Sequence, residues 1–236
     1  MSEPPHLELV AAVAAGLASV TERIERAGGD PEAVGVLAVT KGFGPEAVVA
    51  AHAVGLDQVG ENYAHELEAK RAALGELGGD ASMRWHFLGA LQTNKIRALA
   101  AHVDCWQSVS RETEGERIAR ARPGATVLIQ VAFSSAAGRP GCEPHAVPAL
   151  ARTLFGFGLD VTGLMAVAPR PPDEARAAFV TVRRLADDLG LAVRSIGMTE
   201  DLELAVAEGS TMIRVGRALF GDRPPPGADL RGAAGV

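Results

Sequence analysis

Lysine is scarce in this sequence. Of 23 lysine and arginine residues only Lys41, Lys70 and Lys95 are lysines, and the excess of acidic residues gives a formal net charge of -6. The charges are interspersed along the chain. The sequence therefore lacks the concentrated basic face with which nucleic-acid-binding proteins displace counterions, and we expect no DNA or RNA partner.

Cysteine and long apolar runs are scarce as well. Cys105 and Cys142 stand without a second close-spaced pair, which argues against a disulfide framework or a zinc site and favours two small buried side chains. Apolar stretches are broken by glycine, glutamate or arginine well before the ~20 residues that cross a bilayer. The N-terminal residues 1–5 lack the basic region of a secretory signal. We expect a cytoplasmic protein that does not enter a membrane.

Several common catalytic signatures are also missing. The sequence contains no usable P-loop, dinucleotide-binding glycine fingerprint, G-x-S-x-G motif, or pair of histidines with an acid at metal-binding spacing. We therefore do not expect a metal enzyme or a nucleoside triphosphatase.

One of the three lysines directly follows an apolar strand. Residues 36–39 form a continuous apolar run, which is typical of a parallel strand buried on both faces, and Lys41 comes at its end. An amine at the mouth of an apolar barrel or sheet is poorly solvated in its charged form. Its pKa should therefore fall, which frees the neutral amine that attacks aldehydes. Lys41 is a candidate Schiff-base lysine, and the alternative is a surface lysine at a strand end.

Strand, loop and helix alternate along the chain after a leading amphipathic helix over residues 7–27. The expected strands are residues 36–39, 57–60, 85–89, 103–109, 127–131, 159–167, 192–197 and 212–216. Eight such units with no composition break that marks a linker fit one TIM (β/α)8 barrel domain over residues 1–236 better than an open doubly wound sheet, which remains the alternative. Thr199 is expected to cap the helix after the seventh strand.

In such barrels the active groups lie at the C-terminal ends of the strands, and a phosphate often binds after strands seven and eight. Ser195 and Gly197 end the seventh strand, and Gly216 and Arg217 follow the eighth, so these residues could form an anion pocket, although glycine turns are common at strand ends. Arg214 should point into the barrel, where a buried guanidinium needs an acceptor. The alternative for Arg214 is a salt bridge with a carboxylate on a neighbouring strand.

Asn62 and His86 follow the second and third expected strands and would face the same mouth. Asn62, together with Glu61, could instead cap the next helix. His86 lies between two aromatic residues and is expected to be a hydrogen-bonded core imidazole.

Five segments closely resemble the pyridoxal phosphate homeostasis protein family, and the likeness extends from about residue 7 to residue 222. The segments are residues 38–41 (AVTK), 60–63 (GENY), 85–95 (WHFLGALQTNK), 163–165 (GLM) and 195–216 (SIGMTEDLELAVAEGSTMIRVG). The resemblance implies the barrel of bacterial alanine racemase without its second domain, with pyridoxal 5'-phosphate (PLP) carried on Lys41 as a Schiff base. It also implies that Asn62 flanks the ring and Arg214 meets the pyridine nitrogen. Ser195, Gly216 and Arg217 would surround the phosphate.

The resemblance further implies a role in PLP supply and in amino-acid or keto-acid balance, as a carrier or regulator without catalytic turnover. Apo PLP-dependent enzymes are the candidate recipients, and we expect a monomer. The alternatives are a PLP-dependent amino-acid racemase and a Schiff-base aldolase. A racemase needs acid–base groups on both faces of the cofactor, and Tyr63, the only tyrosine, is expected to pack at a helix start instead.

Three loops depart from the family pattern. Arg217 stands where threonine is usual, and we expect its charge to replace a hydroxyl contact to the phosphate; the alternative is that it lies in solvent. Residues 138–142 lack a usual lysine, and residues 42–44 replace a usual Thr-Lys-Pro run. None of these changes removes Lys41 or Arg214.

Overall fold

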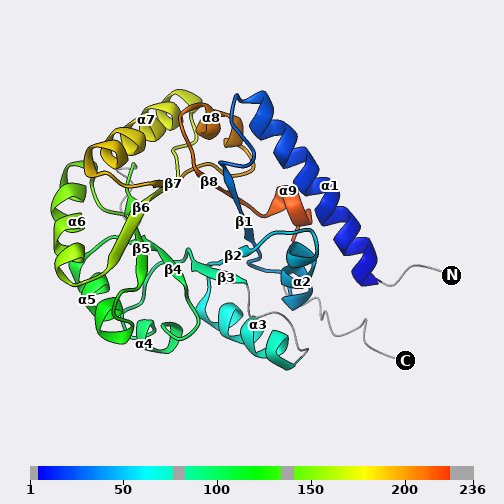
Figure 1. Cartoon of the computed structure of the whole chain (residues 1–236), viewed down its shortest axis with the longest axis horizontal. Helices are drawn as coiled ribbons and strands as arrows, with labels where there is room; N and C mark the ends of the chain where they lie inside the picture. The colour runs from blue at the N-terminus through cyan, green and yellow to red at the C-terminus, as the bar shows by residue number, and fades with distance from the viewer. Residues whose placement is uncertain (1–4, 77–82, 134–140, 224–236) are drawn as a thin grey trace.

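Eight parallel strands form a closed barrel in the order β1 to β8 (Figure 1). The computed structural model describes residues 5–76, 83–133 and 141–223. The strands are β1 (Gly35–Val39), β2 (Gln58–Glu61), β3 (Arg84–Phe87), β4 (Cys105–Val109), β5 (Thr126–Val131), β6 (Asp160–Ala166), β7 (Val193–Ser195) and β8 (Met212–Val215). The first and last strands pair with each other and close the barrel, with Leu37 opposite Arg214. The expected barrel is thus confirmed, and the open sheet is wrong.

Helices surround the barrel on its outside (Figure 1). They are α1 (Pro5–Arg26), α2 (Pro45–Ala53), α3 (Ala64–Glu76), α4 (Ile96–Leu99), α5 (Glu112–Ala121), the 3-10 helix η1 (Pro144–Ala146), α6 (Val147–Gly156), α7 (Pro172–Leu189), α8 (Leu202–Ala207) and α9 (Arg217–Phe220). The expected leading helix is confirmed, and it packs against α2, α8 and α9. No helix in the described ranges combines the length and the hydropathy that a membrane crossing requires.

The helix after the seventh strand begins later than the sequence suggested. Thr199 was expected at its N-cap, but α8 begins at Leu202 with Asp201 in that position. The Asp201 side chain accepts a hydrogen bond from the Met198 backbone N–H at 2.6 Å, so the chain first makes a turn over residues 198–201. The extension of the domain to residues 1–4 and 224–236 stays a prediction, because these residues lie outside the described ranges.

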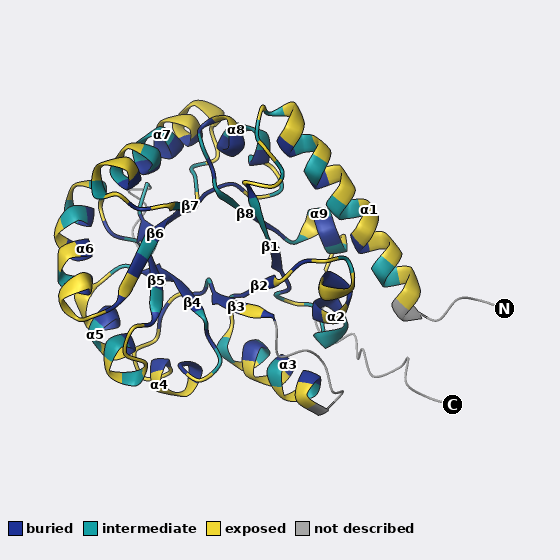
Figure 2. Cartoon of the chain, in the orientation of Figure 1, coloured by how far each residue is buried: buried dark blue, intermediate teal, exposed yellow. Residues whose placement is uncertain are grey.

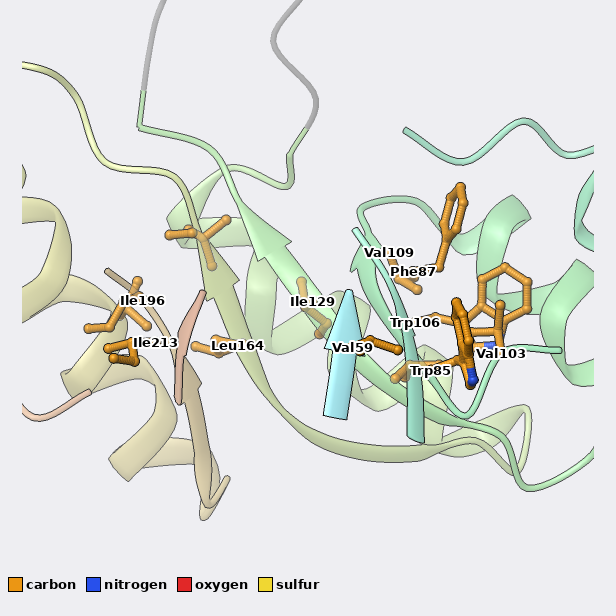
Figure 3. Packing of buried hydrophobic residues seen from close by; sticks show 14 of the residues in the cluster. Val59, Trp85, Phe87, Val103, Trp106, Val109, Ile129, Leu164, Ile196 and Ile213 are labelled. Carbon is orange, nitrogen blue, oxygen red and sulfur yellow. The ribbon is translucent and has the colours of Figure 1, made fainter. Parts of the chain in front are cut away.

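The strands present an apolar face to the helices and a largely polar face to the barrel interior. Trp85, Trp106 and Ile129 are fully buried between sheet and helices, and the rings of Phe87 and Trp106 pack edge to face with centroids 6.0 Å apart (Figure 3). The outer faces of the helices are exposed while the strands are mostly buried (Figure 2). The main hydrophobic core therefore lies between the sheet and the helices.

Cys105, Leu128 and Met165 form a small apolar cluster separate from the main core. Gln107 on β4 bonds to Ser195 on β7, which is possible only through the interior because these strands are not neighbours. Both cysteines are free and buried, as expected. Because side chains alternate between the two faces of a strand, the interior faces of β1 and β8 end in Lys41 and Arg214.

Gly163 allows β6 and β7 to lie close together, and we predict that Gly163→Ala destabilises the protein by roughly 1–3 kcal/mol. A β-carbon at this position would lie 2.1 Å from the Val193 carbonyl oxygen, so the strands would have to separate. Urea unfolding measures the change. The control is Gly75→Ala in α3, where a β-carbon meets nothing within 4 Å and where the helix should gain about 0.5–1 kcal/mol. Equal stabilities for Gly163→Ala and the original protein would contradict the close approach of the strands.

Candidate functional site

The C-terminal ends of the strands surround a cavity of about 1480 Å³. All of the predicted site residues except Ser195 line it, namely Lys41, Asn62, Arg214, Gly216 and Arg217. These residues come from the ends of β1, β2 and β8, which are neighbours in the barrel. The fold thus brings the predicted residues to one opening, as the position rule for such barrels leads one to expect.

Lys41 extends from the end of β1 into this cavity and is partly buried. Burial lowers the pKa of its amine, because the charged form loses hydration, and the positive charges of Arg223 and Arg214 lower it further. Glu61 and Glu66 act in the opposite direction. The expected fall of the Lys41 pKa is confirmed, and the amine is neutral at a lower pH than an ordinary lysine.

Arg214 is buried at the floor of the cavity and has only neutral acceptors among the described residues. Its guanidinium donates to the backbone oxygen and the hydroxyl of Ser195, the latter at 3.0 Å, and to the Ala166 carbonyl at 2.8 Å. These contacts occupy at most three of its five N–H donors. Burial lowers the pKa of Arg214 to about 10. The alternative of an internal salt bridge is therefore wrong for the described part of the chain.

A chain of hydrogen bonds crosses the barrel interior and ends at Arg214. Ser195 accepts from Arg214 and donates its hydroxyl to the Gln107 carbonyl oxygen at 2.7 Å, and the Gln107 amide pairs with His86 Nδ1 at 2.7 Å. Burial lowers the pKa of His86 to about 4, so the neutral ring accepts this bond. His86 is thus the core imidazole that was expected, and Ser195, which is fully buried, orients Arg214.

Asn62 contributes an unpaired acceptor beside the cavity. Its side-chain oxygen is buried and has no hydrogen-bond partner among the described residues. The Asn62 backbone lies close to Gly89, which follows β3. A β-carbon added to Gly89 would lie 1.9 Å from the Asn62 carbonyl oxygen. A buried acceptor without a donor is costly, which favours a ligand group as its partner.

The expected phosphate side of the cavity is formed by the end of β8. A β-carbon on Gly216 would lie 2.9 Å from the Val39 carbonyl oxygen, so glycine permits β1 and β8 to approach here. The Arg217 side chain is 63% exposed and lies 3.3 Å from Glu200. Its contact with phosphate stays a prediction. Residues 138–140 of the loop that lacks the usual lysine lie outside the described ranges.

Sequence reasoning missed a buried ion pair behind Lys41. The spacing of Glu66 and Lys70 predicts a helix but no partner for Lys70 outside it, and in the structure Lys70 is 3% exposed and bonds to Glu61, which is fully buried. The available signal was the position of Lys70 on the same face of α3 as the buried Leu67 and Leu74. The Glu61 carboxylate therefore pairs with Lys70, and its role is not limited to the helix cap that the sequence offered as an alternative.

Tyr63 does not pack as expected. Its side chain is 52% exposed, and its ring lies beside that of His65 with the centroids 5.9 Å apart. It precedes α3 on the outside of the barrel and is not among the residues that line the cavity.

We predict that Lys41 reacts faster than Lys95 with a trace amount of acetic anhydride at neutral pH. The lowered pKa of Lys41 gives it a larger neutral fraction, whereas Lys95 is exposed and serves as the internal control. Mass spectrometry of peptides across a pH series measures both rates. A Lys41 midpoint at or above that of Lys95 would contradict the desolvated environment.

Comparison with known proteins agrees with this geometry. The family model of the alanine racemase N-terminal domain matches residues 16–224. A pyridoxal phosphate homeostasis protein of Pseudomonas aeruginosa is 42% identical over 216 residues, which cover 87% of this chain and 92% of the relative. Its Escherichia coli K12 counterpart is 36% identical over 228 residues, covering 89% of this chain and 97% of the relative.

Solved structures show the same fold. PipY of Synechococcus elongatus, solved with PLP bound, is 33% identical and covers 89% of this chain and all of its own, with a TM-score of 0.76. The alanine racemase of Streptomyces coelicolor is 23% identical with a TM-score of 0.71, and the match spans 59% of that enzyme, so it shows the barrel alone. From the family match and the curated relatives together, the chain belongs to the alanine racemase N-terminal domain family and, within it, to the pyridoxal phosphate homeostasis proteins.

Proposed function

We propose that this protein binds PLP in the cavity through Lys41 and serves PLP homeostasis as a carrier or regulator. The observation that carries the proposal is an amine of lowered pKa in the same cavity as a buried guanidinium with unused donors. An amine of this kind bonds to aldehydes, and the guanidinium calls for an acceptor. The names of the relatives and the PLP bound to PipY support the proposal.

The residues present fit the chemistry of PLP. The cofactor has an aldehyde, a pyridine nitrogen and a phosphate, and when bound it supplies an electrophilic carbon and an electron-withdrawing ring. Lys41 would hold the aldehyde carbon, and the remaining donors of Arg214 would meet the ring nitrogen. Asn62 would lie beside the ring. Gly216 and the charge of Arg217 would hold the phosphate, with Ser195 acting through Arg214.

Arg214 also bears on the kind of chemistry the site supports. Although burial lowers its pKa to about 10, the guanidinium stays protonated at neutral pH and acts as a donor only. A ring nitrogen that accepts from it stays unprotonated, which makes the ring a weaker electron sink. The chain would thus hold the cofactor in a form poorly suited to stabilising carbanions.

A carrier is favoured over a racemase because Arg214 would keep the ring nitrogen unprotonated. Among the described residues that line the cavity there is no tyrosine, histidine or cysteine, and the groups that could exchange a second proton are the carboxylates of Glu200, Asp201, Glu203 and Asp222. We also propose that the chain acts as a cytoplasmic monomer and that apo PLP-dependent enzymes receive the cofactor. A racemase-like enzyme is the second candidate because Lys41 itself can exchange protons. An aldolase is the third.

The proposal predicts that PLP forms a borohydride-reducible adduct on Lys41. Purified protein incubated with PLP should gain a visible absorption band, and peptide mapping after reduction should locate the label. Lys41→Ala should abolish the adduct, because neither of the other lysines offers a comparable amine. The Lys70 amine is held by hydrogen bonds to its acceptors, and Lys95 is exposed to solvent. Lys95→Ala, the control, should retain it. Labelling chiefly on Lys70 or Lys95 would overturn the site, and a colourless protein would favour the aldolase.

The carrier proposal predicts negligible amino-acid racemisation. The PLP-loaded protein is incubated with L-alanine in heavy water, and α-proton exchange and D-alanine are followed by NMR. We expect turnover far below about 1 per second, the lower end of the usual enzyme range. Lys41→Ala is the control for background exchange. Faster D-alanine formation that depends on Lys41 would establish the racemase alternative.

A further inference from the structure

The backbone on both sides of Lys41 is held by side chains from the neighbouring β2–α3 unit. On the preceding residue, the Thr40 hydroxyl donates to Glu61 and the Thr40 carbonyl accepts from Lys70 at 2.7 Å. On the following residue, the Gly42 N–H donates to Glu66 at 2.7 Å. The residue that carries the reactive amine is therefore fixed at both of its peptide bonds.

Lys70 joins these contacts into one cluster. Its ammonium donates to Thr40 and Glu61 and lies 3.5 Å from Glu66, so each of its three N–H groups has an acceptor. The side chains of Lys70 and Glu61 are 4% and 0% exposed, whereas Glu66 is 21% exposed. A pair buried this deeply loses hydration, and the hydrogen bonds of Lys70 and of Glu61 Oε1 offset part of that loss, while Glu61 Oε2 has no partner among the described residues.

The cluster lies on the opposite side of β1 from the cavity. Lys41 lines the cavity, while Thr40, which precedes it, points towards α3 as the alternation of side chains requires. β1 ends at Val39, and Gly42 adopts a left-handed conformation with φ of 77° directly after Lys41, so the chain turns away from the strand direction here. The direction of the lysine side chain thus depends on contacts made behind it.

We propose that Lys70, with Glu61 and Glu66, is a positioning cluster that fixes residues 40–42 and thereby aims the Lys41 amine into the cavity. This inference rests on the proposed PLP site at Lys41. Reaction rates depend steeply on the placement of the reacting group, so a cluster that never contacts the cofactor can still control how fast it binds.

The charges of the cluster also act on Lys41. The charged groups that bear on its amine are Arg214 on β8, Arg223 after α9, Glu61 on β2 and Glu66 on α3. The two arginines lower the pKa of Lys41 and the two glutamates raise it. Removing the Glu61 charge should therefore move the Lys41 pKa downwards, because the ammonium form loses an attractive partner.

The test measures the rate of PLP adduct formation from the growth of the visible band. Lys70→Met removes the donors in a side chain of similar length, and we expect the rate to fall by roughly ten- to a hundredfold. Its matched control is Lys95→Met at an exposed lysine, which should react at the original rate. Glu66→Ala removes the bond to Gly42, and its control is Glu68→Ala at an exposed position of the same helix.

Two further variants separate positioning from folding. Glu61→Gln keeps an acceptor for Thr40 and should shift the pH midpoint of adduct formation downwards, which a purely structural role would not do. Glu61→Gln combined with Lys70→Met removes both buried charges, so it tests the loss of Lys70 even if Lys70→Met alone does not fold. Circular dichroism and thermal unfolding identify the folded variants.

The outcomes are distinct. Slow adduct formation in the folded Glu66→Ala and double variants, with unchanged controls, supports the cluster. Original rates in both of these variants, or an unchanged midpoint in Glu61→Gln, would overturn it. If the original protein forms no reducible adduct on Lys41, the proposed function fails, and the positioning cluster that rests on it fails too.

Discussion

The pairing of β1 with β8 is the interaction on which the site depends. It closes the barrel and places Leu37 opposite Arg214, so residues from the two ends of the chain reach the same opening. Without this closure Lys41 and Arg214 would lie at opposite edges of an open sheet. Closure also removes both sheet edges and buries side chains that point inward, which lose hydration. The lowered pKa values of both side chains follow from that loss of hydration.

Two cations in one desolvated space repel each other, and the protein does not neutralise Arg214 with a carboxylate among its described residues. Carbonyl and hydroxyl dipoles hold the guanidinium instead, through Ser195 and the interior chain to Gln107 and His86. Such neutral acceptors fix its orientation without a direct ion pair, and the negative charge of Asp201 acts on the guanidinium through space. The carboxylates near Lys41 are kept on the outer side of β1, where Lys70 binds them. Lys41 and Arg214 therefore bring positive charge to the cavity, whose lining also includes the carboxylates of Glu200, Asp201, Glu203 and Asp222.

Much of this could be predicted from local sequence. The apolar run before Lys41 and the eightfold alternation of strands and helices predicted the barrel, because both patterns follow from backbone periodicity and burial. The helix α2 begins at Pro45, as its sequence favours, since proline is tolerated in the first turn of a helix. The position rule for barrel sites then selected Asn62, Arg214, Gly216 and Arg217, which all line the cavity.

The sequence by itself determined the order of the elements, the place of Lys41 just after β1 and the inward direction of Arg214, since these depend on near neighbours in the chain. Only the tertiary structure decided that Ser195 turns to Arg214 and Gln107, that Tyr63 is exposed, and that Lys70 is buried against Glu61. Each of these outcomes depends on which side chain from a distant strand or helix supplies the hydrogen-bond partner. Periodicity gives the face on which a residue lies, but the partner on that face is fixed only when the barrel closes and the helices pack against it.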